Sequence, residues 1–396
     1  MNTRLLTSIY SLAPNGIAAR VSLAVVASAG ILYANLSPVI ISGLAQDSGF
    51  TSEAAGYVFA GNMYGTAIGG FTIIFLINQL NWKWTAVALA ALLICSDLLS
   101  AQFETADVLY IIRFIHGLIG GALVGVGMSV IARTENPERT IAFAIVIQLS
   151  LGGIGAAVIT PLLATVGVSA VWIALTGLST LALALVPFLD RYPVTNGQDG
   201  RPPSAGRASG SNILLALAAL FSFQAGQMAA FAYRIELGTH YGFETGLVSL
   251  VIAVSLLAGA PSGLAVAWWS TRSGRLLPAC IGVGLMTSVT GMLLIPNYWV
   301  FGAASIGFAV FFTVAFPYLL GVASEMDNSG QMAAIGAFVS SLGLATGPAI
   351  AATLLGENNH EQVLKFSCAA LATSAVLVFG PSRMLDRRER HKRVVW

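Results

Sequence analysis

The feature that most constrains this chain is a series of apolar stretches, each long enough to cross a bilayer as a helix. Runs of about 20 residues, the length that spans the roughly 30 Å hydrocarbon layer, recur along all 396 residues. Charged residues make up only 9% of the sequence, against about 25% in a soluble domain. The runs are continuously apolar and do not alternate, which excludes a transmembrane β-barrel. The sequence therefore predicts an all-α integral membrane protein.

Twelve transmembrane spans follow from these runs, separated by short polar breaks. They cover residues 20–45, 54–77, 82–102, 107–132, 139–165, 168–189, 212–238, 245–269, 275–296, 299–323, 330–355 and 361–381. The one long polar stretch, residues 190–211, is rich in Pro, Gly and Ser and predicts a flexible linker. The predicted organisation is an N-terminal segment 1–19, a six-helix bundle 20–189, the linker 190–211, a second six-helix bundle 212–381 and a basic tail 382–396.

The distribution of Lys and Arg predicts which side of the membrane each segment faces. One side holds both termini, the linker and most cations of the loops, namely Arg4, Lys83, Arg133, Arg191, Arg201, Arg207, Arg272, Arg275 and the tail RMLDRRERHKRVVW. The other side carries Asp47, Glu53, Glu104, Asp107, Glu244, Glu357 and Glu361, with Lys365 as the nearby cation. Cytoplasmic loops are enriched in Lys and Arg, so both termini are expected in the cytoplasm. The short loops favour a bacterial inner membrane.

The two halves carry similar small-residue patterns, which indicates a duplicated six-helix unit. The second span has Gly61, Gly65 and Gly69 at four-residue spacing, and the eighth span has Gly259 and Gly263. Because six is even, both halves enter from the same side and form parallel repeats about an axis along the membrane normal. Such a pair predicts a central cavity with a solute site near the midplane, which rocking of the halves exposes to each side in turn.

Two motifs resemble those of the major facilitator superfamily. RFIHGLIGGALVGVGMSVIA in the fourth span is similar to its R-x-x-x-G motif, and GLATGPAIAA, with Gly347 and Pro348, is similar to its G-x-x-x-G-P motif. The resemblance covers residues 20–381 and implies a secondary transporter of twelve helices in two pseudo-symmetric six-helix bundles. In the fifth span Thr160 precedes Pro161 where the family has Gly, which weakens an inference of efflux by exchange. A monomer is expected.

The family's loop signature between helices 2 and 3, G-x-x-x-D-R-x-G-R-R, is kept only in outline. Asn78 stands where the acid is expected, and the copy in the second half keeps Arg272, Gly274 and Arg275. The substitute ion pairs that these loops offer are Lys83 with Glu135 or Glu138, and Arg272 or Arg275 with Glu325 or Asp327. The alternative is that these charges are solvated, since exposed pairs contribute under about 1 kcal/mol.

Small residues at four-residue spacing line the second, fifth, eighth and eleventh spans. In the family, helices 2 and 11 meet across the interface between the halves, and so do helices 5 and 8. The resemblance therefore implies that these stripes are surfaces that slide. Tight static packing, which small residues also permit, is the alternative.

Five ionisable residues fall inside the predicted spans, where an unpaired charge is costly: Asp97, Arg113, His116, Arg234 and Glu236. Asp97 and Arg113 each lie about 9 Å from the outer end of adjacent spans, which predicts an ion pair with His116 one turn deeper. The pair is either structural or part of a proton-coupling set with His116 and Glu236. Arg234 and Glu236 either extend to the membrane interface, or Arg234 joins Arg113 in attracting an anionic solute.

Polar and aromatic side chains near the midplane are the predicted solute contacts. An amide at this depth needs a partner, either a neighbouring helix or a bound solute. The polar candidates are Tyr33, Asn35, Asn62, Tyr64, Gln148, Gln224, Gln227, Ser340 and Ser341, together with Arg113 and Arg234. Phe231 and Phe312 are candidates for an apolar wall that suits an aromatic or amphipathic solute, and packed or lipid-facing rings are the alternative.

The sequence contains no GxxxxGK[ST] loop, no HExxH or GxSxG motif and no metal-spaced Cys and His set. An enzyme is not indicated, and no cofactor is expected beyond a transmembrane ion gradient, with protons as the expected ion. The predicted function is secondary transport of a small organic solute, among membrane lipids and without nucleic acid. The candidate solutes are an organic anion and an amphipathic aromatic compound. A drug-type efflux antiporter is the alternative within this class, although spans 1 and 2 lack the acid that carriers of cationic drugs use. A lipid-translocating or transport-inactive sensor protein on the same scaffold is the alternative from another class.

Overall fold

The structure, a computed structural model, describes residues 12–47, 50–77, 79–103, 105–190, 192, 209–269, 274–326, 331–356 and 359–395, and its regular elements there are all helices. The N-terminal half contains α2 (Ile17–Ala29), α3 (Leu32–Asn35), α4 (Ser37–Asp47), α5 (Ser52–Leu76), α6 (Trp82–Ser100), α7 (Ala106–Ile131), α8 (Pro137–Val166), α9 (Ser169–Leu185) and the short 3-10 helix η1 (Val186–Phe188). The C-terminal half contains α10 (Gly210–Ala232), α11 (Arg234–His240), α12 (Thr245–Trp269), α13 (Leu276–Met292), α14 (Tyr298–Ser324), α15 (Gln331–Leu355) and α16 (His360–Val395). The predicted all-α fold of two six-helix bundles is confirmed, with α2 to α4 forming the first span and α10 with α11 the seventh.

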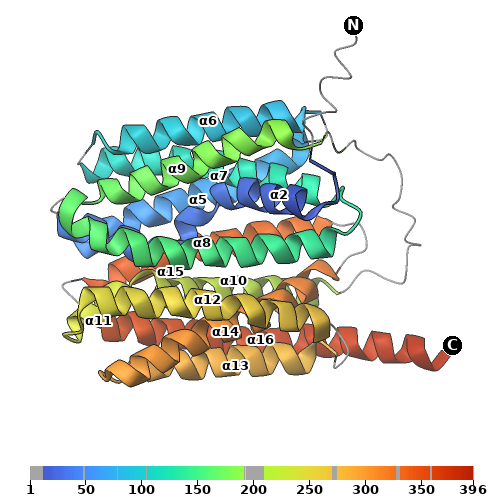
Figure 1. Cartoon of the computed structure of the whole chain (residues 1–396). Coiled ribbons are helices and arrows are strands. Elements are labelled where there is room, and N and C mark those ends of the chain that lie inside the picture. Colours follow the sequence, from blue (N-terminus) through green and yellow to red (C-terminus); the bar gives the residue numbers. More distant parts are fainter. Residues whose placement is uncertain are drawn as a thin grey trace, which may run out of the picture.

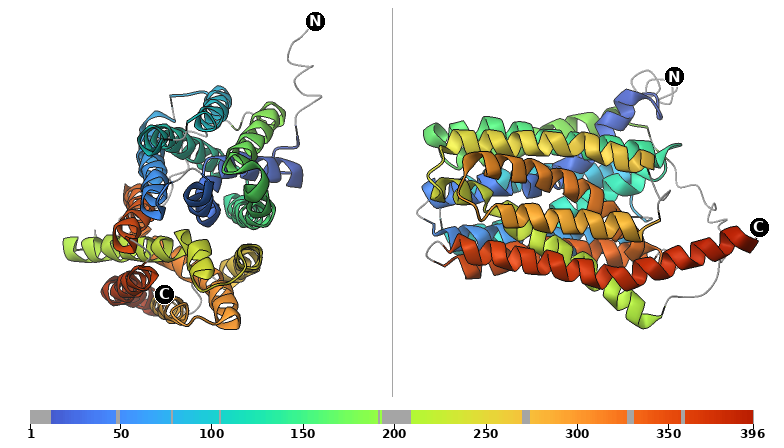
Figure 2. Two further views of the ribbon diagram at one scale, coloured as in Figure 1. Left: turned by 90° about the vertical axis from the view of Figure 1, so that its left-hand side faces the viewer. Right: turned by 90° about the horizontal axis from the view of Figure 1, so that it is seen from below.

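The two halves lie side by side, and their long helices run in nearly the same direction (Figure 1). In Figure 1, α6, α9 and α8 of the N-terminal half lie above α12, α14 and α13 of the C-terminal half. The end view in Figure 2 shows the blue and green helices of one half and the yellow to red helices of the other as two groups. We call the face at which α16 ends the tail face, and the opposite face, at which α11 lies, the loop face (Figure 1).

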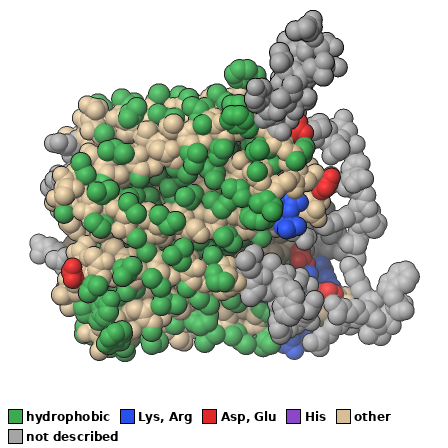
Figure 3. All heavy atoms as spheres, viewed as in Figure 1, with side chains coloured by type: hydrophobic (Ala, Val, Ile, Leu, Met, Phe, Trp, Pro, Cys, Tyr) green, Lys and Arg blue, Asp and Glu red, His purple; other side chains and the backbone are tan. Residues whose placement is uncertain are grey.

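The outer surface of the two bundles is apolar. Ten of the described helices are long and apolar enough to cross a membrane, and α2 and α13 are shorter apolar helices. Large apolar side chains are exposed, among them Trp84, Ile173, Trp299 and Val376. Figure 3 shows apolar side chains spread over the middle of one side, with most charged side chains gathered toward the tail face. An exposed apolar area of this extent is typical of a surface that contacts lipid.

The first span of each half is interrupted, a feature that hydropathy does not predict. Gly30–Ile31 separates α2 from the single turn of α3, and Leu36 separates α3 from α4. Pro38, near the start of α4, has no amide hydrogen to donate to Ala34, so the hydrogen-bond ladder of the helix stops there. In the seventh span Tyr233 separates α10 from α11, with φ −101° and ψ 20°. Each half therefore contributes one discontinuous helix.

The helices expected to meet across the two halves do so. α5 packs against α15, α8 packs against α12, and α4 contacts both α10 and α11. The backbones of α8 and α12 approach closely at this contact. A methyl group added at Gly153 of α8 would lie 2.9 Å from the backbone oxygen of Ala253 in α12. The junction between the halves is therefore built from α4, α5 and α8 on one side and α10, α11, α12 and α15 on the other.

The regular glycine stripes of α5 and α15 lie within the halves, so the sliding surface predicted for these two helices is wrong. A methyl group added at Gly65 would lie 2.1 Å from the backbone oxygen of Phe114 in α7, and one at Gly121 of α7 would lie 2.1 Å from the backbone of α5. In the C-terminal half, a methyl group at Gly347 would lie 2.1 Å from the backbone oxygen of Ala225 in α10. Helix backbones in this direct contact form tight static packing, which was the alternative.

Candidate functional site at the junction of the halves

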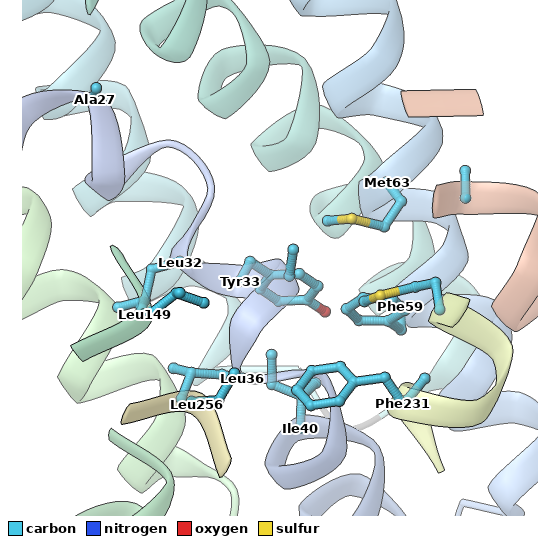
Figure 4. Packing of buried hydrophobic residues seen from close by; sticks show 14 of the residues in the cluster. Ala27, Leu32, Tyr33, Leu36, Ile40, Phe59, Met63, Leu149, Phe231 and Leu256 are labelled. Atoms are coloured by element: carbon cyan, nitrogen blue, oxygen red, sulfur yellow. The ribbon is translucent and has the colours of Figure 1, made fainter. Parts of the chain in front are cut away.

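Buried aromatic and aliphatic side chains from both halves meet at the junction (Figure 4). Tyr33 of α3 stacks on Phe59 of α5, with ring centroids 5.4 Å apart. Phe231 of α10 approaches the same cluster from the other half, beside Ile40 of α4 (Figure 4). The Tyr33 side chain is buried, and its hydroxyl has no hydrogen-bond partner among the described residues. The interruption of the first span thus brings a polar group into an apolar cluster.

The predicted ion pair between Asp97 and Arg113 is confirmed, and both side chains are fully buried. Arg113 Nη1 donates to Asp97 Oδ1 at 2.9 Å. Arg113 Nη2 donates to the backbone oxygen of Ser96 at 2.8 Å and to the Ser100 hydroxyl. The guanidinium also lies 4.5 Å from the Trp172 ring, and of its nitrogens only Nε has no acceptor in the described part of the chain. The charge of Arg113 is therefore neutralised inside the N-terminal half.

His116 extends this network one turn along α7. Its Nε2 lies 3.3 Å from Asp97 Oδ1, and its Nδ1 lies 2.8 Å from the amide nitrogen of Asn62. An amide nitrogen only donates, so Nδ1 is the acceptor and Nε2 carries the proton. Asn62 also donates to the backbone oxygen of Arg113 at 2.9 Å. The imidazole is thus held as the neutral form, because a proton at Nδ1 would break its bond to Asn62.

Arg234, the first residue of α11, is buried like Arg113, so the alternative in which it extends to the membrane interface is wrong. Its side chain is only 1% exposed. Within the residues that the structure describes, none of the three guanidinium nitrogens has a hydrogen-bond partner. The guanidinium lies over aromatic faces, 4.1 Å from the Phe308 ring and 5.8 Å from the Phe231 ring. Arg234 is therefore a buried cation without an acceptor from the described protein.

Glu236 connects α11 to the other half. Its Oε1 accepts a hydrogen bond from the Ser52 hydroxyl of α5 at 2.8 Å, and its Oε2 has no partner among the described residues. The neighbouring Tyr233 hydroxyl donates to the backbone oxygen of Pro348 in α15 at 3.4 Å. This hydroxyl fits only beside glycine, since a methyl group added at Gly56 would lie 1.7 Å from it. These contacts hold the Tyr233–Glu236 segment against α5 and α15 toward the loop face.

Four of the predicted solute contacts that carry amide groups have partners within their own half, namely Asn35, Asn62, Gln224 and Gln227. Asn35 donates to the backbone oxygen of Gln148 at 3.0 Å. Gln224 donates to the Ser340 hydroxyl at 2.7 Å, and Gln227 donates to Gln224 at 3.2 Å. For Asn35, Asn62 and Gln224 the structure brings a neighbouring helix to the amide, which was one of the two possibilities, whereas Gln227 bonds within α10.

The remaining predicted contacts are placed in three different ways. The Tyr64 hydroxyl lies 3.2 Å from the Thr346 hydroxyl of α15, across the junction. Ser341 donates to the backbone of its own helix at 3.0 Å, so it is Ser340 that faces the amides. Phe312 stacks on Phe223 at 6.0 Å within the C-terminal half, which makes it a packed ring.

The loop between α12 and α13 keeps a charge cluster that α16 completes. Arg275 pairs with Glu325 at 2.7 Å, as one substitute pair predicts, and also with Glu389 of α16 at 2.6 Å. Asp386 of α16 accepts from two consecutive backbone N–H groups at the start of α13, at 2.8 and 3.0 Å, beside Gly274, whose φ is +79°. Burial lowers the pKa of Arg275, but hydrogen bonds to Glu389 and Glu325 outweigh burial and raise that pKa above its usual value. The predicted tail thus supplies acids that the loop signature lacks.

The other residues of the predicted motifs make fewer contacts that bear on the site. Asn78, Arg272 and Asp327 lie outside the described residues, as does most of the linker. Lys83 donates to the backbone oxygen of Leu189, and its pairing with the acids between α7 and α8 stays a prediction. Pro161 lies inside α8, which continues past it to Val166.

Sequence reasoning missed the aromatic rings that face the two arginines. Trp172 of α9 and Phe308 of α14 come from distant spans, and no local pattern marks them. Ser100 was missed as well, although its position three residues after Asp97, on the same face of α6, is a signal that could have marked it.

Two six-helix bundles with discontinuous helices and buried polar groups at their junction define a class of membrane protein, the secondary transporters. The chain belongs to the Major Facilitator Superfamily, whose sequence model matches residues 22–348. Among solved structures, a mutant of the nucleoside transporter NupG is similar, with a TM-score of 0.71, 12% identity, and coverage of 93% of this chain and 98% of that chain. An identity this low shows the fold alone. No curated protein matches the chain.

Proposed function

We propose that the protein is a proton-coupled secondary transporter that moves a small organic solute, either an organic anion or an amphipathic aromatic compound, by alternating access. The observation that carries this proposal is the interrupted first span of each half, since α4 contacts both α10 and α11 at the junction. Discontinuous membrane helices present backbone and side-chain polar groups to solutes near the centre of the bilayer. A solute held there contacts both halves, so its binding favours the approach of the two halves toward each other.

The proposed location is a bacterial inner membrane, with the tail face in the cytoplasm. The cations near the tail face support this orientation, and they include Arg20, Lys83, Arg133, Arg139, Arg275 and Arg383. Acids predominate at the loop face, among them Glu53, Asp107, Glu244 and Glu361. This distribution obeys the positive-inside rule. The proposed working unit is a monomer that uses an ion gradient and no cofactor.

Proton coupling is proposed to run through Glu236. Its carboxylate accepts from Ser52 across the junction and keeps a second oxygen without a partner in the described part of the chain. Protonation of that oxygen removes a buried negative charge from a contact that holds the halves together toward the loop face. Asp97 and His116 are weaker candidates for this role, because Arg113 neutralises the first and Asn62 occupies the free nitrogen of the second.

Purified protein in liposomes with a pH-sensitive dye inside tests this function. In the wild type, addition of a transported solute is expected to change the interior pH. Glu236→Gln is expected to abolish that pH signal while solute exchange continues, and Glu244→Gln, at an exposed acid of the loop face, is expected to behave as the wild type.

Two results would contradict the proposal. Solute uptake with the pH signal intact in Glu236→Gln would remove this residue from coupling. If no organic solute enters wild-type liposomes under a proton or sodium gradient, and a fluorescent phospholipid moves between leaflets instead, the lipid-translocating alternative replaces the transporter.

A further inference from the structure

Arg234 carries a charge that nothing in the described part of the chain balances. Its side chain is 1% exposed, its three guanidinium nitrogens have no hydrogen-bond partner, and its nearest described neighbours in space include the faces of Phe308 and Phe231. A ring face attracts a cation but accepts no hydrogen bond from the N–H groups at the guanidinium edge in the way that an oxygen does. A buried ion in this situation strongly favours any partner that brings an acceptor.

A guanidinium presents its N–H groups as a planar fork, which matches the two oxygens of a carboxylate. We propose that Arg234 binds the carboxylate of the transported solute, and that this solute is a monocarboxylate with a planar, apolar body. The inference rests on the proposed carrier function, because it places the solute at the junction of the halves.

A single negative charge follows from the number of unbalanced cations. Arg113, which is fully buried in the N-terminal half, already donates to Asp97, to the Ser96 backbone and to Ser100. Because its charge is neutralised, it offers no second anion site. A dianion at Arg234 would bury one negative charge without a partner, which disfavours dicarboxylates and phosphate esters.

The planar, apolar body follows from the side chains around Arg234. Phe308 lies 4.1 Å from the guanidinium, and Phe231 lies 5.8 Å from it. Figure 4 shows Phe231 beside Ile40 and near the stacked rings of Tyr33 and Phe59, so the apolar surface continues from Arg234 into the centre of the junction. Flat rings of this kind pack well against another flat apolar group.

Two further hydroxyls offer hydrogen bonds to a polar substituent on such a body. The Tyr33 hydroxyl is buried and has no partner among the described residues. Ser305 is fully buried, and its hydroxyl also has no partner there, although Ser324 of the same helix donates to the backbone oxygen of Leu320. Ser305 lies three residues before Phe308 on α14, so the two share a helix face.

Equilibrium binding of radiolabelled benzoate and phenylacetate to the purified full-length chain in detergent tests the site. The wild type is expected to bind at least one of these carboxylates, and benzamide and phenylacetamide are expected not to compete. Arg234→Gln is expected to weaken binding at least tenfold. Arg234→Lys keeps the charge but loses the planar fork, so an intermediate loss is expected. Arg139→Gln, at an exposed arginine of α8, is the matched control and should leave binding unchanged.

Failure of the inference is distinct from failure of the proposed function. If neither carboxylate binds to the wild type, or if Arg234→Gln binds them like the wild type, the Arg234 site is wrong. If liposomes accumulate an organic solute equally well with Arg234→Gln, the transporter stands and the site falls. If the carboxylates bind through Arg234 but never cross the membrane, the site stands and the transport function falls. Thermal melting of each variant confirms that it is folded, and Arg234→Gln should melt no lower than the wild type.

Discussion

Arg113 and Arg234 are both buried, one in each half of the molecule, and they differ in what surrounds them. Arg113 donates to a carboxylate, a backbone oxygen and a hydroxyl, and it lies over Trp172. Arg234 lies over Phe308 and has no acceptor among the described residues. The same residue type at the same burial therefore has two different environments, and we propose that the first arginine stabilises the N-terminal bundle and that the second binds a ligand. Acceptors, more than burial, distinguish a structural arginine from a binding one.

The helices that carry the two arginines also differ in how they are held in the structure. Arg113 lies on α7, whose Gly117 and Gly121 bring its backbone into direct contact with α5. Arg234 begins a short helix after the break at Tyr233, and this helix is held by Glu236 across the junction. We interpret α7 as part of a fixed frame and α11 as the element whose contacts change during transport.

The largest expected effect comes from removing the carboxylate beside Arg113. Asp97→Ala leaves a buried arginine without its counter-ion and is expected to lower the free energy of unfolding by about 3–5 kcal/mol. The double variant Asp97→Ala with Arg113→Leu is expected to recover more than half of this loss. Unfolding in mixed detergent and SDS, followed by circular dichroism, measures both. If the double variant is as unstable as Asp97→Ala, the uncompensated charge of Arg113 is not the cause of the lost stability.

Substitution of Arg234 is expected to change the free energy of unfolding in the opposite direction. Arg234→Leu removes an unbalanced buried charge and is expected to raise the free energy of unfolding of the ligand-free protein by about 1–4 kcal/mol. The same SDS titration measures it, and transport by this variant is expected to be lost. A clear loss of stability would contradict the comparison, because it would mean that Arg234 is satisfied within the folded chain.

A smaller effect is expected from the glycine contacts that hold the frame. Gly121→Ala places a methyl group 2.1 Å from the backbone of α5, and the resulting separation of α5 and α7 is expected to cost about 1–3 kcal/mol. Gly177→Ala is the matched control, since a methyl group there meets nothing within 4 Å. It should be neutral or stabilising by about 0.5–1 kcal/mol. Equal stabilities of the two variants would remove the argument for a rigid frame.

The smallest effect is expected at the tail face. Glu325 is 44% exposed where it pairs with Arg275, which has two further acids nearby. Glu325→Gln is therefore expected to change the free energy of unfolding by less than about 1 kcal/mol, and less at high salt than at low salt. Melting temperatures at the two ionic strengths check this. A large, salt-independent loss would mean that this cluster matters as much as the buried pair.

Much of the fold could be predicted from the sequence, because the length of each apolar run matches the thickness of the bilayer. The twelve spans, the two halves and the pair of Asp97 with Arg113 follow from run lengths and from matching depth. The interruption at Tyr233 and the ring of Phe308 over Arg234 could not be predicted, since each depends on packing between distant spans. The glycine ladders show the same limit: spacing reveals a close contact but does not name the partner helix.

A structure of the protein determined with 4-bromobenzoate, whose bromine gives an anomalous signal, tests the central claim most directly. We predict that the carboxylate lies within hydrogen-bond distance of the Arg234 guanidinium, at about 2.7–3.2 Å, with the bromine at the junction beside Phe231. The Arg113 and Asp97 pair is expected to be unchanged. Bromine found only on the lipid-facing surface or beside Arg113, with a protein oxygen accepting from Arg234, would contradict the account.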